Sequence, residues 1–84
     1  MMANADRVRH VLSKLTRTEG LANDDDIFGR GFLNSLNAVQ LISLIESEFG
    51  VRVEDADLDI TNFRSVVAIA GFVAQKTGAE ERTS

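Results

Sequence analysis

Cysteine, proline, tryptophan and tyrosine are all missing from this sequence of 84 residues. Without cysteine the chain can form no disulfide, no thiolate metal site and no cysteine nucleophile, which fits a protein of the reducing cytoplasm. The single histidine, His10, cannot bind zinc without cysteine partners, so we expect no metal site. No apolar run is long enough to span a bilayer and no segment resembles a signal peptide, so we expect no membrane attachment.

Several catalytic and ligand-binding motifs are excluded by spacing. Asp24–Ser35 has a glycine at the sixth position of a calcium loop, but Phe28 at the fifth and Ser35 at the twelfth cannot supply the required ligands. Gly29 and Gly31 lack the third glycine and the preceding strand of a phosphate-binding loop. Nothing in the spacing supports Ser35 and His10 as a nucleophile and its base. A chain with no catalytic cluster is typical of a binding module, and we predict no enzymatic activity.

Acidic residues are concentrated in the middle of a chain whose formal net charge is −4 at pH 7. Residues 35–63 hold six carboxylates, and Arg52 is their only basic residue. A single arginine among six carboxylates cannot neutralise a phosphate backbone, which argues against nucleic acid and suggests basic protein partners. A solvated face that keeps the protein in solution would carry the same charges.

The first third of the chain predicts one helix and a long connection. A helix from Asn4 or Asp6 to Leu15 is indicated by a single apolar stripe at positions 8, 11, 12 and 15. The connection runs from Thr18 to Asn34, and a loop of this length is usually functional or held by its own apolar residues. The residues that we expect to hold it against the helices are Leu21, Ile27, Phe28, Phe32 and Leu33.

A second helix is predicted from Ser35 to Phe49, with Gly50 as a left-handed stop. At 100° per residue its core face consists of Ala38, Ile42, Ile45 and Phe49, with Leu41 beside it. The opposite face consists of Asn37, Gln40, Ser43, Ser47 and Glu48, and Leu36 and Leu44 also fall on this polar side.

The last part of the chain predicts an acidic loop over Val51–Asp59, a short turn of helix at Ile60–Phe63 and a final helix that begins after an N-cap at Ser65. The inner stripe of the final helix is Val66, Ile69, Ala70 and Val73, flanked by Phe72. No strand pattern competes. We therefore predict an all-α four-helix bundle with a short third helix and a long first loop. It forms a single domain over residues 1–84, with an ordered core at about 4–77 and a flexible tail at 79–84.

The most informative segment is Asn34-Ser35-Leu36, because it leads directly into the second helix, which ends in Glu46-Ser47-Glu48-Phe49-Gly50. This segment resembles the phosphopantetheine attachment region of acyl and peptidyl carrier proteins, whose usual core is Asp-Ser-Leu. Further along, Asp57-Leu58-Asp59-Ile60, followed by Asn62-Phe63-Arg64-Ser65 and the helix over Val66–Val73, looks like the third-turn and final-helix segments of discrete carriers. The resemblance covers roughly residues 25–73, and it implies the acyl-carrier type of four-helix bundle.

The resemblance implies a carrier that holds its cargo on a 4'-phosphopantetheine arm, attached to Ser35. A phosphopantetheinyl transferase, which uses magnesium, would add the arm from coenzyme A. An acyltransferase or ligase would then load a thioester, and a synthase would unload it. The carrier itself would be a non-catalytic monomer. The start of a helix also suits a phosphodiester on physical grounds, because free N–H groups and the helix dipole favour an anion there. The structural alternative is that Ser35 or Asn34 only caps the helix.

The second helix departs from the family pattern by losing acidic residues near Ser35. Asn34 replaces the usual aspartate, and Asn37, Gln40 and Ser47 stand where acidic residues are common. The loss favours a discrete carrier of a specialised pathway, such as polyketide or hybrid biosynthesis, over the main carrier of fatty-acid synthesis. Such a pathway implies a short or polar cargo that stays in solvent. The expected partner contacts are Asn34, Leu36, Asn37, Val39, Gln40, Ser43, Glu46 and Ser47, and Leu44 is a weaker candidate.

Two alternatives remain open on the sequence. One is an aminoacyl or peptidyl carrier of nonribosomal peptide synthesis, which the less acidic second helix would suit. The other is an unmodified helical interaction module in which Ser35 has no chemical role.

Overall fold

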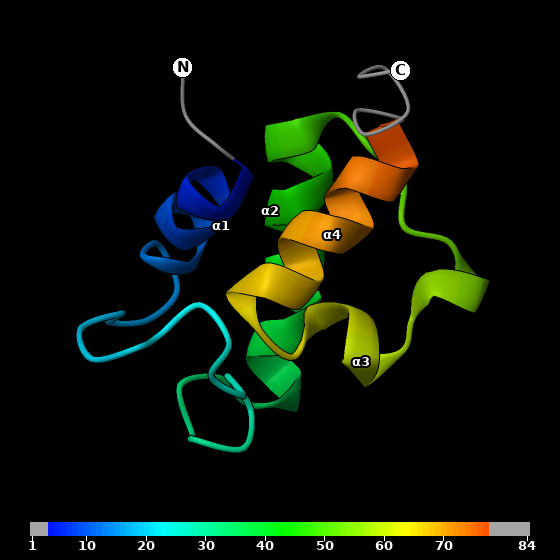
Figure 1. Cartoon of the computed structure of the whole chain (residues 1–84). Coiled ribbons are helices and arrows are strands. Elements are labelled where there is room, and N and C mark those ends of the chain that lie inside the picture. Colours follow the sequence, from blue (N-terminus) through cyan, green and yellow to red (C-terminus); the bar gives the residue numbers. More distant parts are fainter. Residues whose placement is uncertain (1–3, 78–84) are drawn as a thin grey trace.

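The computed structural model describes residues 4–77, and within this range the chain forms helices and no strand. In chain order the elements are α1 (Asn4–Leu12), α2 (Ser35–Phe49), the short 3₁₀ helix η1 (Asp55–Asp57), α3 (Ile60–Phe63) and α4 (Val66–Thr77). Figure 1 shows α4 crossing in front of α2, with α1 beside them and α3 at the lower end of α4. Helix α1 packs against both α2 and α4. The prediction of an all-α four-helix bundle with a short third helix and a long first loop is confirmed. The tail predicted at 79–84 lies outside the described residues.

The first helix is shorter than the sequence pattern indicates, because α1 ends at Leu12 and not at Leu15. Beyond that point the backbone tightens: the N–H of Lys14 donates to the carbonyl of Val11 at 3.1 Å, and that of Leu15 to Leu12 at 2.9 Å. Such three-residue spacing is a common way to satisfy the last carbonyls of a helix. Leu15 still packs against the core from this turn, which explains why the apolar stripe continues past the helix.

The core lies between α1, α2 and α4, and the first loop contributes to it. The loop side chains Leu21, Ile27 and Leu33 are buried, and Phe28 and Phe32 pack against them, as predicted. Two backbone bonds tie the loop to the α3–α4 junction: Ile27 N–H to Arg64 C=O at 2.6 Å and Val67 N–H to Asn23 C=O at 2.9 Å. The long first loop is therefore part of the folded core. The fully buried residues of the helices are Val8, Val11, Leu12, Leu41, Ile45, Val66, Ile69 and Val73.

The buried face of α2 is rotated from the one that the sequence predicts. Leu41 and Ile45 are fully buried, whereas Ala38, Ile42 and Phe49 are only half-buried. Ala38 and Ile42 face a cavity described below, which accounts for their partial exposure. The helix ends at Gly50 in the left-handed conformation, at φ 66°, as expected.

Leu44 does not lie on the solvent side of α2, where the sequence analysis placed it as a weak candidate for a partner contact. It is half-buried and packs against the core. One turn further on, the guanidinium of Arg7 bonds to the side chain of Glu48 at 3.3 Å and to its carbonyl at 2.9 Å. Arg7 also lies over the ring of Phe49, at 4.4 Å from its centroid. Helix α1 thus covers this side of α2, and the predicted placement of Leu44 on the solvent side is wrong.

The C-terminal part has the capping residues that the sequence indicates. Ser65 Oγ accepts the N–H of Ala68 at 3.0 Å, which caps α4. Phe63 of α3 packs on Phe72 of α4, with ring centroids 5.1 Å apart. None of the helices within residues 4–77 is long and apolar enough to cross a membrane. The same range contains no cluster of three or more side chains that could hold a metal ion.

Candidate functional site

The first residue of α2 is Ser35, and the residue before it caps the helix. Asn34 has an extended backbone, and its Oδ1 accepts the N–H of Asn37 at 3.0 Å. The hydroxyl of Ser35 is exposed and has no hydrogen-bond partner among residues 4–77. Of the two residues that could have served as the cap, Asn34 therefore takes the structural role. The Ser35 hydroxyl is left free at the N-terminus of a helix of 15 residues.

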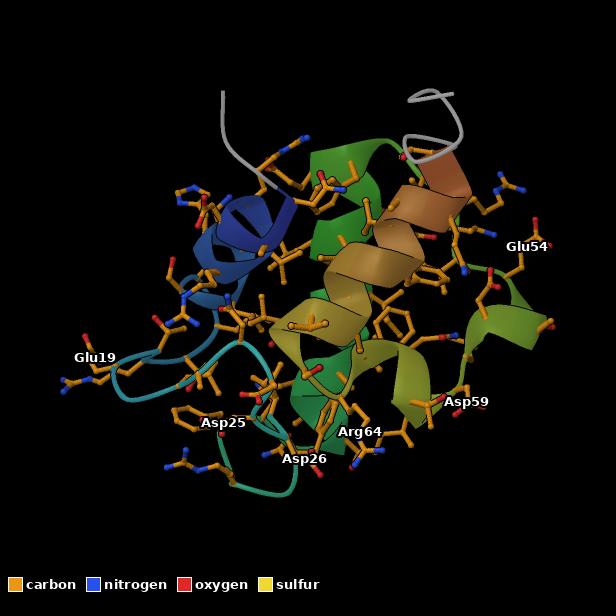
Figure 2. All side chains as sticks on the ribbon, viewed as in Figure 1. Glu19, Asp25, Asp26, Glu54, Asp59 and Arg64 are labelled. Atoms are coloured by element: carbon orange, nitrogen blue, oxygen red, sulfur yellow. The ribbon has the colours of Figure 1, made fainter. Side chains whose placement is uncertain are left out.

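The backbone that approaches Ser35 is an ordered turn. Asp26 Oδ1 accepts the N–H groups of Phe28 at 3.1 Å and Gly29 at 2.9 Å, and the N–H of Leu33 donates to the carbonyl of Ile27 at 3.3 Å. Gly31 has a φ of 82°, which side chains rarely adopt, so a glycine is needed there. Asp26 also lies 3.9 Å from the guanidinium of Arg64, where the loop meets the end of α3 (Figure 2). These contacts hold Ser35 in a defined position.

The start of α2 carries no carboxylate in its first turn. Asn37 and Gln40 are instead joined by a hydrogen bond of 3.3 Å from Nδ2 to Oε1. The N–H groups of the first turn and the helix dipole consequently favour an anion beside Ser35 without opposition from acidic side chains on this turn. A phosphodiester on the Ser35 oxygen fits this environment.

The side chains expected to contact partners do not all share one environment. Leu36 and Val39 are large apolar residues that are 79% and 67% exposed. Glu46 is half-buried, and its carboxylate accepts the N–H of Val53 at 2.8 Å, which turns it toward the loop after α2. Of the remaining candidates, Asn37 is half-buried, and Asn34, Gln40, Ser43 and Ser47 are exposed.

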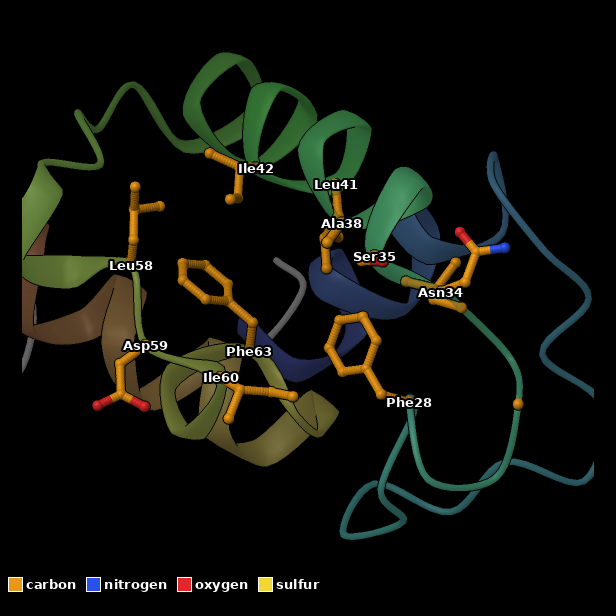
Figure 3. A pocket seen from close by; sticks show the side chains of 12 residues that line it. Phe28, Asn34, Ser35, Ala38, Leu41, Ile42, Leu58, Asp59, Ile60 and Phe63 are labelled. Carbon is orange, nitrogen blue, oxygen red and sulfur yellow. The ribbon is translucent and has the colours of Figure 1, made fainter.

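A cavity of about 620 Å³, which the sequence patterns above do not predict, opens beside Ser35. Its walls are mostly apolar, with α2 on one side and α3 and the residues before it on the other (Figure 3). The lining residues are Phe28, Gly31, Leu33, Asn34, Ser35, Ala38, Leu41, Ile42, Leu58, Asp59, Ile60 and Phe63. The available signal was the pair of apolar residues, Leu58 and Ile60, within an otherwise acidic loop. Their exposed fractions are 55% and 62%, so the far wall is poorly covered.

Asp59 is the one charged residue that lines this cavity. Its Oδ1 accepts the N–H and the hydroxyl of Thr61, at 3.0 and 2.9 Å, and so caps α3. The backbone N–H of Thr61, followed by the hydroxyl of the same residue, lowers the pKa of Asp59 below its ordinary value. In Figure 3 the carboxylate points away from the cavity, which leaves the interior apolar.

Comparison with known proteins identifies a family and a similar protein. The family described as "Phosphopantetheine attachment site" matches residues 6–73. The chain is also similar to the D-alanyl carrier protein of Enterococcus faecalis (strain ATCC 700802 / V583), with 39% identity over 54 residues. This alignment covers 62% of the present chain and 69% of that protein.

Proposed function

The chain belongs to the carrier-protein family that has a phosphopantetheine attachment site, and from this premise we propose that Ser35 carries the arm. The observation that supports this choice is the free, exposed hydroxyl of Ser35 at the start of α2, next to a cap supplied by Asn34. A serine that capped the helix would lose its cap hydrogen bond on modification. Ser35 can be modified without that loss, because the bond belongs to Asn34.

The role of Ser35 would be that of an acceptor nucleophile, with the catalytic groups supplied by a phosphopantetheinyl transferase. The Ser35 oxygen would attack the phosphate that bears the pantetheine in coenzyme A, and adenosine 3',5'-bisphosphate would leave. The hydroxyl proton would pass to a base of the transferase. The helix N-terminus would then stabilise the new phosphodiester by about 0.3–1 kcal/mol. When bound, the arm supplies a terminal thiol that holds the cargo as a thioester.

For the cargo we propose an acyl unit of a specialised pathway of the polyketide or hybrid type. An acyl cargo is supported by the apolar cavity of about 620 Å³ beside Ser35, because each methylene that entered it would gain roughly 0.8 kcal/mol. The type of pathway is supported separately, by the lack of acidic residues in the first turn of α2. The cavity thus gives an apolar acyl chain a place in the fold, whereas the departures in α2 alone favour a short cargo in solvent. The partners would be the loading acyltransferase or ligase and the synthase that takes the cargo.

An aminoacyl carrier is the second candidate, and a specific observation favours it. The similar protein from Enterococcus faecalis is named a D-alanyl carrier protein. The first turn of α2 is also free of acidic residues, unlike that of the strongly acidic acyl carriers. Loading trials with short acyl, long acyl and aminoacyl groups on the modified protein separate the two, because only a long apolar chain gains from the cavity.

The attachment itself is tested by intact-mass measurement after incubation with coenzyme A and a broad-specificity transferase. We expect a gain of one phosphopantetheine in the wild type and none in Ser35→Ala. Ser43→Ala is the matched control, because Ser43 is an exposed serine on the same helix, and it should be modified normally. No gain in the wild type would favour the unmodified interaction module, and a gain in Ser35→Ala would move the attachment elsewhere.

A further inference from the structure

The outer wall of the cavity is built from a segment that has little support from α2. Helix α3 packs chiefly against α4, and the stacking of Phe63 on Phe72 is part of that contact. Leu58 and Ile60 line the cavity on this side and are still more than half exposed. Exposed apolar side chains across an open apolar gap are driven to close it, because closure removes apolar surface from water. Something must therefore hold the wall away from α2.

The segment is held at Asp57, the residue immediately before Leu58. Its Oδ2 accepts the Nζ of Lys76 at 2.7 Å and the N–H of Glu54 at 3.0 Å. Its carbonyl accepts the Nδ2 of Asn62 at 2.9 Å. Asp57, the last residue of η1, thus joins this turn to α3 and to the end of α4.

Lys76 is well placed to serve as the anchor on α4. Its ammonium lies 5.8 Å from the ring centroid of Phe72, the residue one turn earlier, which packs on Phe63 of the wall. The side chains of Lys76 and Asp57 are 25% and 23% exposed. The other ion pairs within residues 4–77 are all more exposed than this one.

We propose that the Asp57–Lys76 pair is a strut that holds the wall formed by Leu58 and Ile60 away from α2. It thereby sets how long an apolar chain attached at Ser35 the cavity accepts. This inference rests on the proposed function only in taking Ser35 as the point of attachment. The two residues act through the wall and have no contact with the cargo, so they are positioning residues.

Loss of the strut has a consequence that a purely structural ion pair would not have. A structural pair contributes equally to the empty and the filled protein, so its removal lowers both melting temperatures by the same amount. Without the strut the empty wall closes onto α2, and an entering chain must first reopen it. The stabilisation gained per methylene of the attached chain then falls, whatever happens to the empty protein.

The absence of cysteine allows a direct test that needs no transferase. Ser35→Cys introduces one thiol at the cavity, at a helix N-terminus that favours the thiolate. The thiolate attacks the sulfenyl sulfur of an alkyl methanethiosulfonate. A disulfide to the alkyl chain forms, and methanesulfinate leaves with the electron pair of the broken S–S bond. Ethyl to decyl reagents give a series of chain lengths, and the Tm of each product gives a slope per methylene.

The slope is compared in five backgrounds that all carry Ser35→Cys: no further change, Lys76→Met, Lys76→Arg, Asp57→Asn and Lys14→Met. Methionine keeps an unbranched apolar stem over Phe72 and removes the ammonium. Lys14→Met is the matched control, because Lys14 is exposed and its side chain has no partner among the described residues. Asp57→Asn removes the same ion pair from the other side, so an effect seen in both variants cannot come from the methionine alone.

We expect a positive slope in the parent and in Lys14→Met, a slope about half as steep in Lys76→Met and Asp57→Asn, and recovery in Lys76→Arg. Equal slopes in Lys76→Met and Lys14→Met would overturn the strut, even if the melting temperatures of the empty proteins differ. A slope of zero in the parent would overturn it as well, because the chain would then not use the cavity. Neither result depends on whether a transferase modifies Ser35, so a failure here is separate from a failure of the proposed attachment.

Discussion

The two long loops of this protein are held in different ways. The first loop, residues 13–34, has buried Leu21, Ile27 and Leu33 and is tied by backbone bonds to the α3–α4 junction. The second loop, residues 50–59, has mainly local backbone bonds, and only Val51 and Val53 at its start pack against the core. Its later part is tied to α4 through the charged pair of Asp57 and Lys76. Backbone and apolar anchors give one fixed arrangement, whereas a charged anchor on a poorly covered wall can be released.

This contrast matches what the two loops do at the proposed site. The first loop leads to Ser35, which a transferase and several partner enzymes would have to find in the same position each time. The second loop forms the wall of the cavity, which would have to fit cargo of different size. A fixed first loop would let the enzymes find Ser35, and an adjustable second loop would let the cavity fit different cargo.

The strongest test of the contrast is one substitution in each loop. Ile27→Ala removes a fully buried side chain of the first loop and should lower the free energy of unfolding by about 2–5 kcal/mol. Leu58→Ala in the second loop removes a side chain that is 55% exposed and should cost less than about 1 kcal/mol. Chemical denaturation followed by circular dichroism measures both, and similar losses in the two variants would remove the distinction between the loops.

The end of the first loop can be examined with two neighbouring substitutions. Asn34→Ala removes the cap of α2 and should lower the free energy of unfolding by about 1 kcal/mol. Ser35→Ala should leave both stability and helical content nearly unchanged, because its hydroxyl bonds to nothing in the described chain. If Ser35→Ala proved the more damaging of the two, the assignment of structural and chemical roles would have to be exchanged.

Acid should destabilise the attachment of the second loop by protonating Asp57. The Lys76 ammonium, followed by the N–H of Glu54, lowers the pKa of this carboxyl below its ordinary value of 3.8. The stability that it contributes is therefore present above about pH 4 and is lost as the pH falls through the lowered pKa. Asp57→Asn should flatten this acid-dependent loss when Tm is followed from neutral to acid pH.

Asp24→Asn is the control for that titration, because the Asp24 side chain makes no hydrogen bond or ion pair within residues 4–77. It should retain the wild-type pH profile of Tm. Identical profiles in the two variants would mean that the anchor of the second loop does not depend on the charge of Asp57.

The smallest expected effect is on the rate of modification, when the charge near Ser35 is changed. Asn34→Asp combined with Gln40→Glu should speed modification by transferases that prefer acidic carriers, and the gain should shrink as salt screens the attraction. Gln75→Glu is the control, because it adds charge near the far end of α4, away from the start of α2 (Figure 1). Steady-state rates at low and high ionic strength measure the difference. An equal gain in Gln75→Glu would show that net charge, and not its position, matters.

Local features of the fold could be predicted from the sequence because they depend on short spacings. The left-handed stop at Gly50, the cap at Ser65 and the burial of Ile27 all follow from residue type and near neighbours. Helix α1 ends about one turn before the predicted position, because Leu15 continues the apolar stripe in a tighter turn. A hydrophobic pattern reports burial, and it does so equally for a helix and for the turn that follows it.

Only part of the candidate site can be predicted from the sequence. Ser35 could be found from its motif, but the division of roles between Asn34 and Ser35 depends on one side-chain rotamer. The cavity and the Asp57–Lys76 pair depend on how α3 and α4 pack, and these two residues are 19 positions apart. The rotated face of α2 has the same origin, because Ile42 faces the cavity that the packing leaves open.

The central claim, that Ser35 holds the arm, can be tested most directly by locating the modification in the holo protein. Trypsin releases residues 31–52 as one peptide, which contains Ser35, Ser43 and Ser47. Fragmentation of this peptide by tandem mass spectrometry distinguishes the three serines. The account predicts that the added phosphopantetheine lies on Ser35 alone. An unmodified peptide from fully modified protein, or the added mass on Ser43 or Ser47, would contradict it.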